Sequence, residues 1–438
     1  MTVFIQIAQF VLIISILVIL HELGHFIPAK LFKTKVEKFF LFFDVKFALF
    51  KKKIGETVYG IGWLPLGGYV KIAGMIDESM DKEQMSQPPQ PWEFRSKPAW
   101  QRLIIMIGGV VVNFLLAWAI YTVLLVKYGD TYIPADSLKY GIYVDSIGEK
   151  LGLKSGDKIL AVDGKETKNF DEAVLDIILG DEVTVKRDGK TITVPITDEG
   201  KESVFRVQGR NFMNYRRKPV IKIVSEKSAA EEAGLIPGDE IAMVNGRTID
   251  YWDEFTKIIK ASPDKPLRIT VKRNNDLKQI NLQVPTAGII GVAPDVKDLS
   301  ITDEYGFFEA IPAGFNKTIN VLTKQVKQFK VIFNTKTGAY KQVKGPIGIV
   351  EMMPPTWDWG FFWSFMAMFS VWLAFLNILP IPALDGGHVM FLLYEMITGR
   401  KPSEKVLETG QIIGFVILAG LMLLVFGNDI WNIIKRIL

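Results

Sequence analysis

Three residues at the end of the first apolar run could carry out metal-dependent hydrolysis. His21 and His25 stand four positions apart in the sequence His-Glu-Leu-Gly-His. On a helix this spacing places both imidazoles on one face, where they can hold one Zn²⁺ together. Glu22 follows the first histidine directly and can act as a general base toward the attacking water. The pattern therefore predicts a zinc site with His21 and His25 as ligands and Glu22 as the catalytic base.

The surroundings of this motif favour chemistry, although the same pattern also occurs by chance in soluble helices. Residues 4–20 carry no charge and only Gln6 and Gln9 as strongly polar side chains, so the run approaches the length that crosses a bilayer. An aspartate costs roughly 2.5–3.5 kcal/mol at mid-bilayer, and ionisable groups there usually have a function. Two of the chain's three histidines lie in this motif.

A catalytic zinc usually has a third protein ligand, and a later apolar stretch offers two candidates. That stretch runs into the sequence Asn-Ile-Leu-Pro-Ile-Pro-Ala-Leu-Asp-Gly-Gly-His, which ends at His388. Pro380 and Pro382 cannot continue a regular helix, and broken backbone at membrane depth is tolerated only where protein or a water-filled cavity covers it. Asp385 and His388 could each complete the site, and residue types alone do not choose between them.

The composition fits a membrane body that carries polar modules. The chain has 438 residues, of which 49% are hydrophobic, and this length suggests about three domains. The absence of cysteine excludes disulfides and thiolate ligands. A net charge of +5 is modest and indicates membrane orientation rather than nucleic-acid binding. Because the N-terminus has no basic region before the apolar run and no small-residue cleavage site, we expect this run to stay as an anchor.

The elements that must position these residues are membrane helices. We predict about four spans, over residues 1–28, 98–127, 356–398 (with the broken segment) and 405–430. The loop of residues 29–97 is rich in lysine, so it is predicted to be cytoplasmic. This orientation places both termini outside and the zinc motif near the cytoplasmic leaflet.

Within the basic loop, Gly60–Ile72 alternates β-branched and aromatic residues with glycines. Pro65 and the pair Gly67 and Gly68 predict a strand, a turn and a second strand, that is, a hairpin beside the active site. The hairpin could contact substrate or be purely structural, and the residues favour neither. Residues 77–96 are polar and proline-rich and are predicted to form a linker.

The second span holds one strongly polar residue, Asn113, and two adjacent glycines, Gly108 and Gly109. The glycines would allow close helix packing. Asn113 could make a packing hydrogen bond or an active-site contact, and we favour packing.

The polar region between the second and third spans contains an internal repeat. The segment that starts at Leu151 matches the segment that starts at Ala233, with glycines and an aspartate at constant offset. Each copy predicts a strand, a tight Asp-Gly or Asn-Gly turn and a helix. The copies resemble PDZ domains in the bacterial, circularly permuted form, over residues 128–213 and 214–297. They could bind peptides or C-termini by strand addition, or act as spacers.

One spanning helix separates the repeat from the basic loop, which predicts a periplasmic location for the repeat. Residues 298–355 follow, with an amphipathic helix that could lie on the membrane surface. The predicted fold is thus a polytopic α-helical membrane protein with a membrane-associated β-hairpin or sheet and two tandem PDZ-like α+β domains.

The HELGH motif, the tandem PDZ-like modules and the NILPIPALDGGH segment, in this order, resemble a bacterial site-2 protease of the regulator-of-sigma-E type, an intramembrane zinc metalloprotease of peptidase family M50. The resemblance covers essentially the whole chain. It implies that Asp385 is the third zinc ligand and that His388 is a nearby supporting residue. It also implies that Asn377 holds the substrate backbone and that the predicted hairpin pairs with the substrate strand. Our candidate substrate-binding residues are Asn377, Gly67, Gly68, Tyr69, Pro380 and Pro382.

The resemblance further implies an inner-membrane enzyme with one Zn²⁺ per chain. Its substrate would be a single-span membrane protein, such as an anti-sigma factor already trimmed on its periplasmic side, and cleavage would release a cytoplasmic fragment. The partners would be this substrate and membrane lipid, with no nucleic acid. Fe²⁺ or Co²⁺ could also occupy such a site. A transporter or a binding-only scaffold are the competing classes. Four spans without an inverted repeat argue against the first, and the intact general base argues against the second.

Overall fold

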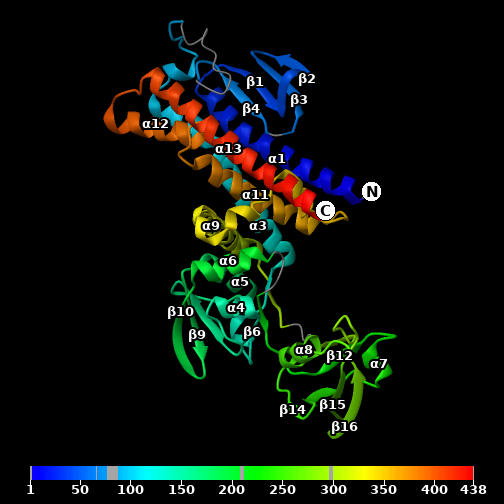
Figure 1. Cartoon of the computed structure of the whole chain (residues 1–438). Coiled ribbons are helices and arrows are strands. Elements are labelled where there is room, and N and C mark those ends of the chain that lie inside the picture. Colours follow the sequence, from blue (N-terminus) through cyan, green and yellow to red (C-terminus); the bar gives the residue numbers. More distant parts are fainter. Residues whose placement is uncertain (1, 66, 76–86, 208–211, 295–298, 438) are drawn as a thin grey trace. The chain divides into compact units, whose positions relative to one another are not determined.

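The computed structural model describes residues 2–65, 67–75, 87–207, 212–294 and 299–437. The chain divides into two compact units (Figure 1). The membrane unit comprises Met1–Asp130, Glu304–Phe329 and Tyr340–Leu438. The repeat unit comprises Thr131–Asp303 and Lys330–Ala339. Half of the predicted linker, residues 77–86, lies outside the described residues.

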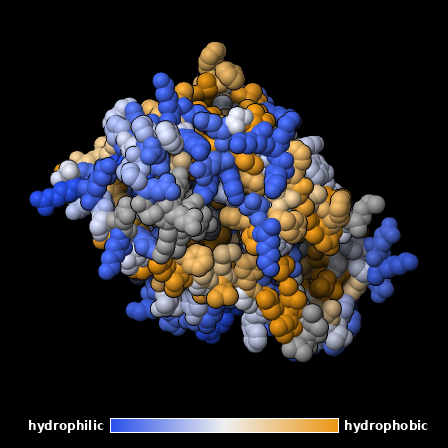
Figure 2. Space-filling view, turned by 90° about the horizontal axis from the view of Figure 1, so that it is seen from above, coloured by the Kyte–Doolittle hydropathy of each residue, from blue (hydrophilic) through white to orange (hydrophobic). Residues whose placement is uncertain are grey.

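Among the described residues of the membrane unit, four helices are long and apolar enough to cross a membrane, in agreement with the predicted number of spans. Many of their large apolar side chains are exposed, as lipid contact requires. Figure 2 shows such hydrophobic residues, in orange, beside hydrophilic ones, in blue, on the face seen from above. The four helices are α1 (Thr2–Leu31), α3 (Ala99–Tyr128), α11 (Trp359–Ile378) and α13 (Glu404–Ile437).

The basic loop forms a four-stranded sheet, not the predicted hairpin. The order is β2-β3-β1-β4, with β3 parallel and β4 antiparallel to β1. The turn at Gly55 makes a hairpin of β2 and β3, so β3 already has β2 on one edge and β1 on the other. The strand after Gly68 therefore pairs with the free edge of β1. The strands are β1 (Val36–Leu41), β2 (Phe43–Ile54), β3 (Thr57–Leu64) and β4 (Tyr69–Ile72).

The break predicted after the third span is present. α11 ends at Ile378, and α12 (Asp385–Thr398) begins after a non-helical connection. Gly386 and Gly387 lie against the backbone of this connection, at positions where a Cβ would overlap Ile378 and Pro382. α13 crosses the same place, because a Cβ on Gly414 would overlap the carbonyl of Pro382. Glycines on two helices thus fix the connection that precedes Asp385.

The repeat unit contains two modules with the same order of elements. In each module a strand, a tight turn and a two-residue strand precede a helix and a two-stranded antiparallel ribbon. The turns contain Asp163-Gly164 and Asn245-Gly246, all with positive φ, as the predicted turn type requires. The first module has β7 (Lys158–Val162), β8 (Lys165–Glu166), α5 (Phe170–Leu179), β9 (Glu182–Arg187) and β10 (Lys190–Pro195); the second has β13 (Glu240–Val244), β14 (Arg247–Thr248), α8 (Trp252–Lys260), β15 (Pro266–Arg273) and β16 (Asp276–Gln283).

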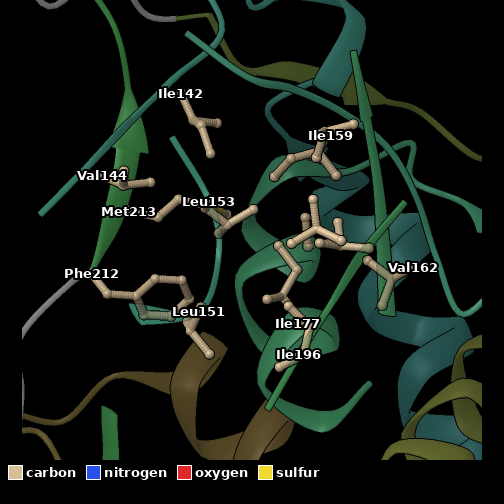
Figure 3. Packing of buried hydrophobic residues seen from close by; sticks show 14 of the residues in the cluster. Ile142, Val144, Leu151, Leu153, Ile159, Val162, Ile177, Ile196, Phe212 and Met213 are labelled. Carbon is tan, nitrogen blue, oxygen red and sulfur yellow. The ribbon is translucent and has the colours of Figure 1, made fainter. Parts of the chain in front are cut away.

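Each module has its own apolar core. In the first, side chains of β7 and α5 meet the residues that flank them, as Figure 3 shows for Ile159, Val162 and Ile177 around Leu151 and Leu153. The corresponding core of the second module includes Ile241 and Phe255. Closing strands complete each module: β6 (Ile142–Val144) pairs with β11 (Met213–Tyr215), and β12 (Ile221–Val224) pairs with β17 (Val292–Pro294).

The helix predicted after the repeat is α9 (Phe307–Phe333). Within the membrane unit, α9 packs against α3. Trp118 donates a hydrogen bond to the carbonyl of Ile311 at 2.8 Å, and Gly314 lies close to Thr122. Because Gly314 has no side chain, α9 and α3 can approach each other closely at this point.

Candidate metal centre

The two histidines of the motif lie on α1, and both rings face α3. Their Nε2 atoms are 3.3 Å apart. His25 is almost fully buried, and its Nδ1 is 2.8 Å from the carbonyl oxygen of Ile105 on α3. With its Nδ1–H donated to this carbonyl, His25 has the Nε2 lone pair free for a ligand role.

Asp385 joins the two histidines from α12, of which it is the first residue. Its Oδ2 lies 3.3 Å from Nε2 of His21 and 3.3 Å from Nε2 of His25. Two residues earlier, Ala383 has φ of 87°, a left-handed conformation that is costly for a residue with a Cβ. The connection therefore turns sharply just before α12, and the first turn of the helix points its carboxylate at α1.

These three side chains fit a zinc ion. The three ligand atoms form a triangle with edges of 3.3 Å. Tetrahedral zinc with bonds of about 2.0–2.1 Å places its ligand atoms about 3.3–3.4 Å apart. Oδ2 of Asp385 is buried and accepts no hydrogen bond from any described residue, which is costly unless a cation binds it. The two imidazoles and one carboxylate are also a common donor set of catalytic zinc sites. Among the described residues they form the one such group of histidine and carboxylate side chains.

Glycines let α1 and α3 approach closely enough to build this site, as predicted for Gly108 and Gly109. A Cβ on Gly24 or on Gly108 would overlap the backbone of the other helix. A Cβ on Gly109 would overlap the rings of His25 and His21. The surface of α3 at this level is therefore the wall against which both imidazoles lie.

Two asparagines contact His21, and one of them was misjudged. Nδ2 of Asn113 is 3.2 Å from Nδ1 of His21, so our preference for a packing role was wrong. The available signal was that Asn113 is the one strongly polar residue inside the second span. Nδ2 of Asn377, at the end of α11, is 3.4 Å from Nε2 of His21. The family resemblance had directed attention to Asn377.

A cleft of about 440 Å³ opens onto the three candidate ligands. Glu22 lines it together with Gly68 and Tyr69 of the β4 edge. The hydroxyl of Tyr69 donates to Oδ1 of Asp44 at 2.8 Å, and Lys38 lies beside both. The catalytic motif and the edge of the sheet therefore share one solvent-accessible space.

The remaining predicted site residues lie around this cleft. His388 lines it one turn after Asp385 but is not in the metal-binding group. Gly67, Pro380 and Pro382 are not among the described residues that line the cleft. Pro382 lies instead against glycines of α12 and α13. Of the two candidates for third ligand, Asp385 is the one that the fold brings to the histidines.

Comparison with known proteins agrees with this chemistry. Residues 9–421 match the model of a family described as peptidase family M50. A putative zinc metalloprotease of Vibrio cholerae is 30% identical over 96% of this chain and 97% of its own length. The regulator of sigma-E protease RseP of Escherichia coli K12 is 30% identical, and that of Salmonella typhimurium is 29% identical, each over 97% of this chain and 98% of its own length. The expected class of enzyme, a zinc metalloprotease, is thereby confirmed. The chain belongs to peptidase family M50.

Proposed function

We propose that this protein is an intramembrane protease that hydrolyses a peptide bond within the transmembrane segment of a single-span membrane protein. The observation that carries the proposal is the triangle of ligand atoms from His21, His25 and Asp385, because α1, which supplies two of them, is long and apolar enough to span a membrane. The cleft beside the triangle contains Glu22 and an open strand edge. A catalytic metal, a base and a peptide-binding edge are what such an enzyme needs.

His21, His25 and Asp385 would hold the zinc ion in this proposal. Bound zinc supplies a Lewis acid that lowers the pKa of water toward neutrality and polarises a carbonyl. Glu22 accepts the proton of the attacking water and later donates it to the leaving amine. Its place beside the first ligand, on the wall of the cleft, suits both transfers.

The β4 strand would bind the substrate in extended form. Among the described residues β4 pairs only with β1, so its other edge can accept a further strand, and Gly68 to Ile72 line the cleft. A helix keeps its carbonyls in internal hydrogen bonds, so a spanning substrate must unwind before it is cut. Strand addition replaces the hydrogen bonds that the substrate loses.

The other candidate residues would support this geometry. The amide of Asn377, beside Nε2 of His21, is placed to hydrogen-bond a substrate carbonyl or amide. Gly67, with φ of 148°, allows the chain to turn into β4. Pro380 and Pro382 would act on the substrate indirectly, by keeping the connection before Asp385 non-helical.

We further propose an inner-membrane location with the lysine-rich sheet on the cytoplasmic side and both termini and the repeat unit in the periplasm. The two modules would be PDZ-like domains that bind a peptide or exclude substrates with bulky outer domains. Because two of the relatives are named regulators of sigma-E, the proposed substrate is an anti-sigma factor trimmed on its outer side. Cleavage would then release a cytoplasmic fragment.

The test is cleavage of a purified single-span protein with a short outer tail by the full-length enzyme in detergent. Mass spectrometry of the products should place the cut inside the apolar segment. Replacing residues near the cut by helix breakers should speed cleavage, because the substrate then unwinds at lower cost. Cleavage only outside the apolar segment, or faster cleavage of a more stable helix, would refute the proposal.

A further inference from the structure

Asn113 is a fully buried polar residue of α3 with one amide atom that lacks a partner. Its Nδ2 lies 3.2 Å from Nδ1 of His21. Its Oδ1 is buried and has no hydrogen-bond partner within the described part of the chain. An unpaired buried carbonyl oxygen costs about 1–3 kcal/mol, so its presence beside a candidate zinc ligand calls for an explanation.

The chemistry of the imidazole ring of His21 explains why an unpaired oxygen lies beside it. A neutral histidine carries its proton on one ring nitrogen and has a lone pair on the other. Because Nε2 of His21 faces Asp385 and His25, Nε2 is the nitrogen that must offer the lone pair to a metal. The proton then sits on Nδ1 and needs an acceptor. His25 meets the same requirement with the carbonyl of Ile105 at 2.8 Å.

Nδ2 of an amide cannot accept that proton, but Oδ1 can. The two ends of an asparagine amide have nearly the same size, and a half-turn about the last side-chain bond exchanges them. This half-turn brings the unpartnered Oδ1 to Nδ1 of His21. We propose that Asn113 is a positioning residue of the zinc site, whose Oδ1 accepts the Nδ1–H of His21. It fixes the tautomer and the plane of the ring so that Nε2 faces the metal. The inference rests on the ligand set of the proposed function.

The surroundings hold Asn113 rigidly enough for this role. The hydroxyl of Ser370 on α11 donates to the main-chain carbonyl of Asn113 at 2.7 Å. Gly109, one turn earlier, lies directly against the rings of both histidines. Asn113 is therefore held from α11, and its amide reaches His21 one turn away from Gly109, against which the rings lie.

The experiment measures zinc affinity of the full-length protein in detergent by competition with a chelator of known affinity, without substrate. Asn113→Leu has a similar size but no acceptor, whereas Asn113→Asp keeps one. Loss of a group that orients a metal ligand typically costs about 10–100-fold in metal affinity. We expect this loss for Asn113→Leu and an affinity within about threefold of wild type for Asn113→Asp, because its carboxylate still accepts a hydrogen bond.

Thr122→Val is the matched control, because it removes a buried hydroxyl from the same helix that donates to the carbonyl of Trp118 within that helix. It should leave zinc affinity unchanged. The inference is wrong if Asn113→Leu binds zinc like wild type, or if Asn113→Asp loses as much as Asn113→Leu. It is also wrong if Thr122→Val matches the loss of Asn113→Leu, since helix packing would then be the cause. A wild type that shows the expected zinc pattern but cuts no membrane substrate would refute only the proposed proteolysis.

Discussion

Two buried aspartates of the repeat unit and the partly buried Asp385 of the membrane unit differ in how their oxygens are satisfied. In the repeat unit, Asp157 receives two hydrogen bonds from Arg187, at 2.7 and 2.6 Å, and one from the backbone N–H of Lys154. Asp239 in the second module has the equivalent partners, with Arg273 at 2.6 and 2.8 Å. In the membrane unit, Asp385 turns toward two imidazoles an oxygen that has no hydrogen-bond partner in the part of the chain that the structure describes.

This difference in hydrogen bonding distinguishes a carboxylate that stabilises the fold from one that can bind a metal. The paired aspartates stabilise their modules, and their hydrogen bonds raise the pKa of Arg187 and of Arg273. Both oxygens of each of these carboxylates already accept hydrogen bonds from an arginine, which leaves little to offer a metal. Asp385 has a buried oxygen that can bind a metal, and the Nε2 atoms of both imidazoles lie 3.3 Å from it. Substitutions at the two kinds of aspartate should therefore have opposite signatures.

The largest effect is expected for Asp385→Asn. The amide keeps the shape but lacks the charge, so zinc affinity should fall by more than the about 100-fold that loss of a supporting residue causes. Cleavage should be lost with it. Zinc competition measures the first, and hydrogen exchange of α5 and β9 should be unchanged. Retention of zinc by this variant would show that Asp385 is not a ligand.

The opposite signature is expected for Asp157→Asn. Arg187 would be left without its charged partner, and because Arg187 is partly exposed we expect a cost of about 1.5–3 kcal/mol, which is typical of hydrogen bonds to a charged group. Amide exchange in β7 and β9 should speed up by about 10-fold or more, because every 1.4 kcal/mol is a factor of ten. Zinc affinity should not change. Asp188→Asn, in the exposed turn after β9, is the control and should leave exchange as it is. Equal exchange in the two variants would contradict a structural role for Asp157.

A smaller loss of zinc is expected for Gly109→Ala. The added methyl group overlaps the rings of His21 and His25, and overpacking of this kind costs about 1–3 kcal/mol. This corresponds to a loss of roughly 5–150-fold if the strain falls on the metal-bound state. Gly420→Ala on α13 is the control, because a Cβ there meets no atom within 4 Å. Unchanged zinc affinity of Gly109→Ala would mean that the rings can move aside freely.

The smallest effect is expected for the exposed pair of Asp181 and Lys330. The hydrogen bond from Lys330 lowers the pKa of Asp181 below its usual value. The stabilisation is therefore present at neutral pH and is lost as the pH falls through the lowered pKa. Because both side chains are about 70% exposed, Asp181→Asn should cost less than about 0.5 kcal/mol, or roughly a twofold faster exchange in β9 at neutral pH. Exchange in variant and wild type should converge once the pH has fallen below the lowered pKa of Asp181. A difference that grows on acidification would contradict this sign.

Local chemistry and spacing predicted the parts of the site that lie close in sequence. The separation of His21 and His25 predicted their common helix face, and the two prolines predicted the break before Asp385. The pairing of the strands could not be predicted from the sequence, because the β-branched residues of β3 and β4 do not indicate that β1 lies between them. Asn113 was misjudged since its partner is 92 positions away, and only the fold brings them together.

The most direct test of the central claim compares wild type with Glu22→Gln. Both proteins should bind about one zinc per chain, the usual count for a catalytic site, because Glu22 is not a ligand in this account. Only wild type should cut a single-span substrate with a short outer tail, since the amide cannot accept a proton from water. If Glu22→Gln cuts as fast as wild type with its zinc bound, Glu22 is not the base and the proposed mechanism is wrong.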